Sequence, residues 1–186
     1  MQKPKHSQKE DSENRQERDF FQTPNYAIDL IIPYIPVGII WEPAAGNGKI
    51  ARRLSQQVVQ SDIENSDTIH YRANFLTWDN PTFHFDSIVT NPPFSLKRKF
   101  WERCLFFNVP FALLLPVDFC GWILREMMME ENQWLIPTRR IDYITPTGRQ
   151  GESSHAQYHS GWFCHGMDLP KQITVVELTN EMKENI

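Results

Sequence analysis

Two consecutive prolines, Pro92 and Pro93, follow a short run at 85–89 whose apolar members predict a buried strand. A proline has no backbone N–H for the hydrogen-bond ladder of a sheet, so the strand has to end at Asn91. Pro92 also keeps Asn91 out of the α region of conformational space. We therefore expect a stiff, extended turn at the carboxyl end of a strand, where open α/β sheets bind their ligands.

This turn carries a defined set of chemical groups. The side-chain oxygen of Asn91 and the carbonyl of Pro92 are hydrogen-bond acceptors, and Phe94 offers the face of an aromatic ring. Two neighbouring acceptors suit an –NH2 group, and the ring suits a planar group stacked upon it. The turn fits an exocyclic amine on a flat heterocycle, or a planar amide. Four residues by themselves leave a plain surface turn as the alternative.

A second motif joins an apolar run at 37–41 to a helical pattern that begins near Ile50. Its residues 42–48 read Glu-Pro-Ala-Ala-Gly-Asn-Gly. A strand, a glycine-bearing turn and a helix open a dinucleotide-type βαβ unit, and the glycines let the backbone come close to a ligand. No Gly-Lys-Ser or Gly-Lys-Thr is present, which excludes a P-loop. An ordinary tight turn is the alternative.

The sequence Asn91–Phe94 resembles the catalytic motif of the amino-methyltransferases that use S-adenosylmethionine (SAM), above all the DNA adenine-N6 methyltransferases. Residues 42–48 resemble the SAM-binding loop of Rossmann-like methyltransferases, Asp/Glu-Pro-x-x-Gly-x-Gly. The sequence Phe-x-Thr-Pro at 21–24 resembles the N-terminal motif whose threonine turn closes over the methionine part of SAM. The resemblance covers roughly residues 19–165, and the three motifs in this order are more specific than any one of them.

The resemblance implies SAM as the cofactor. SAM has no phosphates but carries a cationic amino group and a sulfonium, so the carboxylate of Glu42 is electrostatically suitable near it. Asp62 follows Glu42 by twenty positions, at the end of an expected strand at 58–63, where such folds bind ribose hydroxyls. The predicted cofactor-binding residues are Phe21, Thr23, Pro24, Glu42, Pro43, Ala44, Gly46, Gly48, Asp62, Ile63, Asn74 and Phe75.

Some of these residues have plainer alternatives. Ile63 is expected to line the adenine pocket, and the resemblance implies that Asn74 bonds the amino edge of the cofactor adenine while Phe75 packs on its face. A solvated turn residue is the alternative for Asp62, and a core residue for Phe75. Thr23 is also expected to cap a short helix that has Pro24 at its first position and covers an edge of the sheet.

The resemblance further implies transfer of the SAM methyl to N6 of adenine in DNA, on a base that leaves the double helix. The catalytic residues are then Asn91, Pro92, Pro93 and Phe94. Similar sites methylate adenine in RNA, or the side-chain amide of glutamine in proteins, although the glutamine enzymes favour tyrosine after the prolines. A non-catalytic nucleic-acid-binding subunit is an alternative of another class. A cytosine-C5 enzyme would need a Pro-Cys nucleophile, which is absent here.

Basic residues follow the turn directly. Lys97, Arg98 and Lys99 form the densest basic cluster of the chain and suit contact with nucleic-acid phosphates, with a solvated helix face as the alternative. A polar loop at 145–157 offers further candidates for substrate contact, with a plain surface loop as the alternative. They are Arg149, Ser153, Ser154 and His155.

Strands and helices alternate through residue 133, which predicts an α/β, Rossmann-like methyltransferase fold with a mostly parallel, doubly wound sheet. We expect a third strand at 69–76, a helix after a cap at Ser95, a buried strand at 110–117 and a helix from 118 through 129. Two late strands, at 139–144 and 158–164, are expected to add an antiparallel C-terminal hairpin. A final edge strand is expected at 173–178.

We expect a single domain at 19–186 after a disordered, polar tail at 1–18. We expect no large separate target-recognition domain after Phe94. Recognition would then rest on the 145–157 loop, have little sequence specificity or come from a protein partner. Compact orphan methyltransferases of phages and mobile elements look similar in this respect. The net charge of −4 leaves DNA contact to a local patch. No cysteine or histidine pattern predicts a metal site, and no long apolar run predicts a membrane span, which favours a cytoplasmic protein.

Overall fold

The computed structural model describes residues 19, 21–64, 66–123, 131–145, 148 and 159–184. Several expectations fall outside this part of the chain. They concern the tail at 1–18, the helix beyond residue 123, and the loop residues Arg149, Ser153, Ser154 and His155. These expectations stay predictions.

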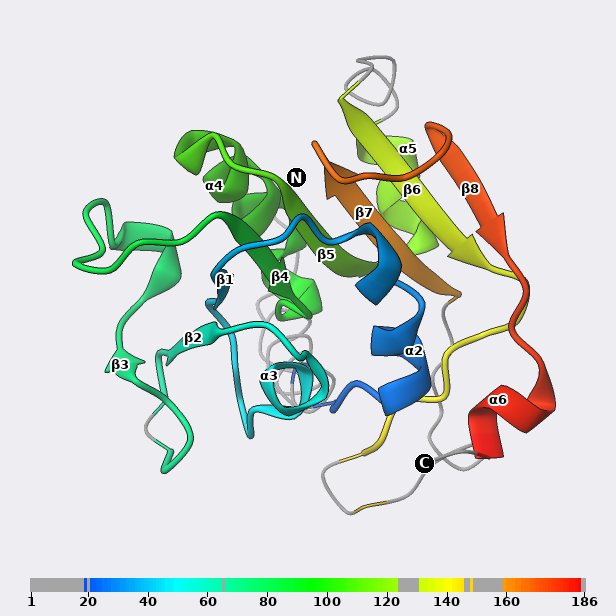
Figure 1. The fold of residues 1–186 in the computed structure, drawn as a ribbon, viewed down its shortest axis with the longest axis horizontal. Helices are drawn as coiled ribbons and strands as arrows, with labels where there is room; N and C mark the ends of the chain where they lie inside the picture. Colours follow the sequence, from blue (N-terminus) through cyan, green and yellow to red (C-terminus); the bar gives the residue numbers. More distant parts are fainter. Residues whose placement is uncertain are drawn as a thin grey trace, which may run out of the picture.

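The described residues form one eight-stranded sheet with the order β3-β2-β1-β4-β5-β7-β6-β8, which Figure 1 shows from β3 at the left to β8 at the right. Its strands are β1 (Ile40–Glu42), β2 (Val58–Asp62), β3 (Tyr71–Arg72), β4 (Ser87–Thr90), β5 (Phe111–Pro116), β6 (Asn132–Pro137), β7 (Ser160–His165) and β8 (Ile173–Val176). Neighbouring strands are parallel except at β7, which runs antiparallel to β5 and β6. The predicted Rossmann-like sheet with an antiparallel C-terminal hairpin is confirmed.

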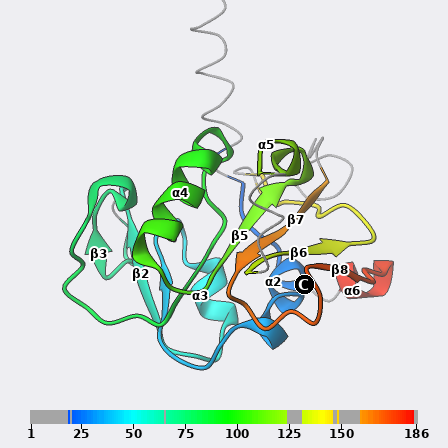
Figure 2. The same cartoon turned by 90° about the horizontal axis from the view of Figure 1, so that it is seen from above.

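Helices cover both faces of the sheet. They are α2 (Asn25–Asp29), α3 (Lys49–Arg53), α4 (Lys97–Phe107), α5 (Cys120–Ile123) and α6 (Asn180–Glu184), with 3₁₀ turns at Ile32–Tyr34, Phe75–Thr77, Phe94–Leu96 and Val117–Phe119. Figure 2 shows α4 and α5 on one face and α2 and α3 on the other. Each face therefore has its own hydrophobic cluster.

The central strand β5 explains this division. All six of its residues are buried. Phe111 and Leu113 pack in the cluster under α4, whereas Ala112 and Leu114 pack in the cluster under α2 and α3, because successive side chains of a strand point to opposite faces. A strand that is covered on both faces is apolar throughout, and the predicted buried strand at 110–117 is confirmed.

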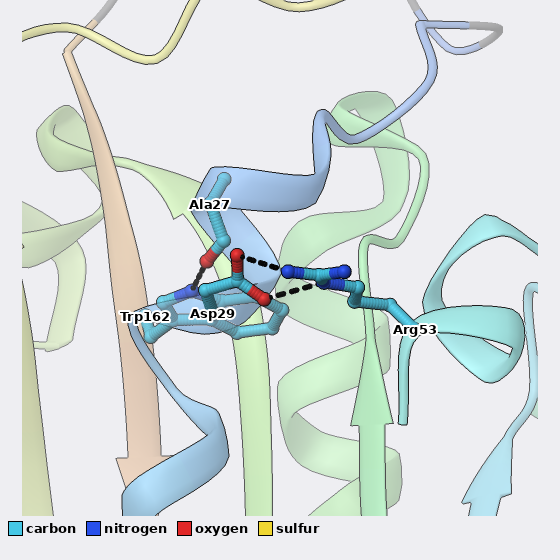
Figure 3. A network of polar contacts seen from close by, with 4 residues as sticks. All are labelled: Ala27, Asp29, Arg53 and Trp162. Carbon is cyan, nitrogen blue, oxygen red and sulfur yellow. Dashed lines mark hydrogen bonds and ion pairs between the residues drawn. The ribbon is translucent and has the colours of Figure 1, made fainter. Parts of the chain in front are cut away.

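Two polar contacts anchor α2 between the sheet and α3 (Figure 3). The buried indole N–H of Trp162 on β7 donates a hydrogen bond of 2.8 Å to the carbonyl of Ala27. The guanidinium of Arg53 on α3 binds both carboxylate oxygens of Asp29, at 2.6 and 2.8 Å. These contacts fix the helix that follows residues 21–24 and so place the Phe-x-Thr-Pro motif.

The hairpin has different strand boundaries from those expected. The strand expected at 139–144 is wrong, because β6 lies earlier, where Trp134 and Leu135 pair with Phe163 and Trp162 of β7. Residues 138–143 form no strand, and only Ile144 makes an isolated bridge. The alternation at 139–144 reflects burial in a connecting segment. The edge strand expected near 173–178 is confirmed as β8.

Three local expectations were also wrong. The third strand is limited to Tyr71–Arg72 and is followed by a 3₁₀ turn at Phe75–Thr77. Pro24 is itself the N-cap of α2, with extended backbone angles and no side-chain cap, so Thr23 does not cap the helix. Ser95 does not cap α4 either, because its hydroxyl bonds Asp19.

Candidate active site

The sheet order places the two main motifs side by side. Strand order runs outward from β1 to β2 and β3 in one direction and from β4 to β5 in the other, so the switch point lies between β1 and β4. Glu42 ends β1, and Asn91 directly follows β4. Open α/β sheets bind ligands in the crevice at such a switch point, outside the carboxyl ends of the strands.

Glu42 is a buried carboxylate, 1% exposed, at this edge. Its Oε2 accepts a hydrogen bond of 3.0 Å from the backbone N–H of Ala51 in the first turn of α3. Burial raises the pKa of Glu42 well above its usual value, and the nearby charge of Asp62 adds to the rise, whereas the Ala51 bond and Arg52 oppose it. An incoming cation would stabilise the carboxylate.

The glycine loop binds the end of β2. The N–H of Gly46 donates a hydrogen bond of 2.8 Å to Oδ2 of Asp62, and the N–H of Ala45 donates one to the carbonyl of Ser61. Gly46 and Gly48 both have left-handed backbones, with φ of 53° and 74°. A Cβ at Gly46 would meet nothing within 4 Å, so the backbone there faces open space.

The turn at Asn91–Phe94 holds an unsatisfied acceptor. Nδ2 of Asn91 lies 3.5 Å from the carbonyl of Phe21, which marks that end of the amide as the donor. Oδ1 of Asn91 is buried and has no hydrogen-bond partner among the described residues. A buried acceptor without a partner is costly, and such a group calls for a donor from a ligand or water.

Phe94 and Phe21 both contact a third aromatic ring, that of Tyr143, which no sequence motif indicated. Tyr143 stacks on Phe21 with ring centroids 6.5 Å apart, and Phe94 meets it edge-on at 5.8 Å. Tyr143 is 2% exposed, and burial raises the pKa of its hydroxyl. It follows β6 in an irregular segment, and no sequence signal separates it from an ordinary core tyrosine.

No protein-family model matches the sequence, and no curated protein does. Solved structures do match. A proposed RNA methyltransferase from Pyrococcus horikoshii is 12% identical, with a TM-score of 0.54 over 84% of this chain and 88% of that one. The 23S rRNA methyltransferase ErmE is 14% identical, with a TM-score of 0.51 over 86% of this chain and 72% of that one.

A type I restriction-modification methyltransferase subunit from Streptococcus thermophilus is 13% identical, with a TM-score of 0.56 over 87% of this chain. This chain spans half of the length of that subunit. The fold is that of the Rossmann-like methyltransferases. At these identities the similarity establishes the fold, and the chemistry has to be argued from the residues of the site.

In this methyltransferase fold, the residues predicted to contact the adenine of the cofactor have different surroundings. Ile63, beside Asp62, is 58% exposed. Asn74 is exposed, and its Oδ1 accepts a hydrogen bond of 3.1 Å from the N–H of Leu76. Phe75 is 2% exposed, and its ring packs on Trp41 and Phe100. Its packing is that of a core residue, and its predicted role at the cofactor stays a prediction.

The predicted basic cluster is largely paired. Nζ of Lys97 lies 3.1 Å from the carboxylate of Asp118, and Nε of Arg98 lies 3.0 Å from that of Glu102 one turn further along α4. Lys99 is exposed. Among the three, Lys99 is therefore the one whose charge is best placed to meet an external phosphate.

Two further findings concern the described residues as a whole. They contain no helix that is long and apolar enough to cross a membrane. They also contain no group of three or more histidine, cysteine or acidic side chains that could hold a metal ion.

Proposed function

We propose that this protein is a SAM-dependent methyltransferase that acts on N6 of adenine in DNA. The observation that carries the proposal is the buried, unpartnered Oδ1 of Asn91, because it lies at the switch point of a methyltransferase fold and lacks a donor. The Asn-Pro-Pro-Phe sequence, which resembles the catalytic motif of adenine-N6 enzymes, supports the same reading.

The residues at the end of β1 and β2 suit SAM. The buried carboxylate of Glu42 matches the cationic amino group, and the open space at Gly46 allows a close approach to the backbone. Asp62 is held beside the loop by the Gly46 N–H and has a second carboxylate oxygen that faces Glu64 N–H at 3.0 Å. When bound, SAM supplies an electrophilic methyl group on a sulfonium.

The turn would act mainly by orientation. The lone pair of the adenine amine is delocalised into the ring, which makes the amine a poor nucleophile. Hydrogen bonds from its two N–H groups to Oδ1 of Asn91 and the carbonyl of Pro92 would favour a pyramidal nitrogen with an available lone pair. The same two oxygens stabilise the positive charge that develops on the nitrogen. Phe94 would hold the flipped base by stacking.

Adenine N6 in RNA is the second candidate, because two of the three solved structures named above have RNA methyltransferase names. A glutamine-amide substrate is less suitable, since enzymes of that kind favour tyrosine at the position of Phe94. A non-catalytic nucleic-acid-binding subunit would not need an orphaned acceptor at Asn91. A protein partner for target recognition remains part of the proposal.

The deciding experiment is transfer of tritiated methyl from SAM to unmethylated duplex DNA, single-stranded DNA, ribosomal RNA and total protein in parallel. Label recovered as N6-methyladenine in DNA is the expected result. Label in RNA or protein would show that DNA is not the substrate, and the proposed chemistry of the Asn91–Phe94 turn would still apply. No label in any of the four would overturn the enzymatic proposal.

A matched variant tests the role of Asn91. Asn91→Ala removes the unpartnered acceptor and is expected to lower methyl transfer about 100- to 1,000-fold, in keeping with the loss of a preorganised polar group at the reacting atom. SAM binding, measured by calorimetry, is expected to survive, because Glu42, Gly46 and Asp62 lie at or just after the ends of β1 and β2 and their described hydrogen bonds do not involve Asn91. Full activity in this variant would contradict the mechanism.

A further inference from the structure

Asp19 reaches the catalytic turn from 76 positions upstream. Its Oδ2 accepts a hydrogen bond of 2.7 Å from the hydroxyl of Ser95, and its Oδ1 accepts one of 3.3 Å from the backbone N–H of Ser95. Ser95 directly follows Phe94 in the chain. The carboxylate of Asp19 therefore holds the end of the turn that carries the proposed catalytic groups.

The need for this contact follows from the sequence of the turn. Ser95 lies in the 3₁₀ turn Phe94–Leu96 that leads into α4, and the first N–H groups of a helix have no partner within the helix. No local side chain caps either element. Asp19 supplies the missing acceptor from a distant part of the chain, and its negative charge suits the positive end of a helix.

The same N-terminal segment contacts the turn at a second place. The carbonyl of Phe21 faces Nδ2 of Asn91, and Phe21 and Phe94 share the ring of Tyr143. Gln22 pairs with Ile144 through two backbone hydrogen bonds of 2.9 and 3.0 Å. Asp19 and Phe21 thus both contact residues of 91–95, and Gln22 pairs with the segment that carries Tyr143.

We propose that Asp19 is a positioning residue for methyl transfer, which keeps Phe94 and Asn91 in the arrangement that receives the target amine by holding Ser95. This inference rests on the proposed function. Orientation of the reacting groups contributes much of the rate in such a reaction, so a small displacement of the turn is costly. Among the described residues, the hydrogen bonds of Asp19 go to Ser95 and none of them reaches Glu42, Gly46 or Asp62, so we expect its loss to lower turnover rather than SAM binding.

Steady-state kinetics of Asp19→Ala, Asp19→Asn, Ser95→Ala and the Asp19→Ala/Ser95→Ala double variant test the inference. Asp19→Ala is expected to lower kcat about tenfold or more, while the KM for SAM stays within about twofold. Asp19→Asn keeps an acceptor and should recover part of the rate. The double variant should be no slower than Asp19→Ala, because both changes break one contact. Effects that multiply, or a KM for SAM that rises while kcat is unchanged, would overturn the inference.

Asp79→Ala is the matched control. It also removes an exposed aspartate that contacts another element, since Asp79 forms an ion pair of 2.8 Å with Arg103 on α4. The control is expected to change kcat by less than about twofold. A decrease in kcat equal to that of Asp19→Ala would show that Asp19 acts only through the general stability of the protein.

Amide hydrogen exchange of peptides that cover 91–96 gives a readout that needs no activity. Asp19→Ala is expected to speed exchange of the Ser95 N–H about tenfold, with little change in peptides from β5. If the natural protein transfers methyl groups and Asp19→Ala changes neither kcat nor exchange, the positioning role is wrong and the proposed function stands. If the natural protein transfers none while exchange still rises, the proposed function fails, and a role for Asp19 in methyl transfer fails with it.

Discussion

The backbone N–H of Gly46 donates a hydrogen bond of 2.8 Å to Oδ2 of Asp62, and this bond joins the glycine loop after β1 to the carboxyl end of β2. The two residues are 16 positions apart, and parallel pairing of β1 with β2 brings them together. Asp62 is therefore part of the loop structure as well as a candidate ligand for ribose hydroxyls.

Replacing Asp62 by alanine removes this acceptor and the one that faces Glu64. We expect SAM affinity to fall roughly tenfold or more, because a hydrogen bond to a charged group contributes about 1.5–3 kcal/mol. Isothermal calorimetry measures the change. Asp67→Ala, which removes another exposed acid from the segment after β2, is the control and should bind SAM normally. Equal SAM affinities for the natural protein, Asp62→Ala and Asp67→Ala would show that Asp62 does not contribute to SAM binding.

Glu42→Gln should separate stability from cofactor binding. The pKa of Glu42 is raised in the folded protein by burial, so the folded state keeps a proton that the unfolded chain has already released. Between the usual carboxyl pKa and the raised one, the free energy of unfolding therefore falls as the pH rises. Glutamine has no charge to bury and keeps an acceptor for the Ala51 N–H.

We therefore expect the cofactor-free Glu42→Gln variant to be more stable than the natural protein at neutral pH. The difference should shrink as the pH is lowered toward the usual carboxyl value, and urea unfolding at several pH values measures it. SAM binding should weaken roughly tenfold, because the charge for the amino group is lost. A variant that is less stable at neutral pH and binds SAM normally would refute both parts.

Phe94 is predicted to stack on the target base. Phe94→Leu keeps apolar contact with Tyr143 but removes the flat ring, and it should lower kcat/KM for the nucleic acid about 10- to 100-fold, as expected for the loss of one stacked base. Phe94→Tyr keeps the ring and should retain most of the activity. The comparison requires only initial rates at limiting DNA. Similar rates for leucine and tyrosine would exclude stacking.

Lys99 and Arg98 are both exposed, but Arg98 is paired with Glu102, and Lys97 is paired with Asp118. Lys99→Gln should weaken duplex DNA binding and lower the slope of log affinity against log salt by about one. Arg98→Gln should have a smaller effect, because Glu102 already neutralises Arg98. Fluorescence anisotropy at several salt concentrations distinguishes the two. Lys171→Gln, just before the edge strand β8, serves as the control.

The local chemistry of the sequence was enough to predict several strands and turns of this protein. Pro92 and Pro93 end β4 at the expected place, since proline cannot continue a ladder. The apolar run at 110–117 became β5, because a strand covered on both faces has to be apolar throughout. The glycine loop lies between β1 and α3 as expected, with Gly46 and Gly48 in backbone conformations that favour glycine.

Tertiary structure alone decided the contacts that join distant segments. Ser95 was expected to cap α4, but its hydroxyl bonds Asp19, and no local pattern encodes a partner 76 positions away. Tyr143 lies in a stretch whose alternation predicts a strand, yet β6 ends at Pro137, and Tyr143 contacts Phe21 and Phe94 from the irregular segment that follows. The order of strands brings these segments to one edge of the sheet, and that order depends on long-range packing that sequence periodicity does not record.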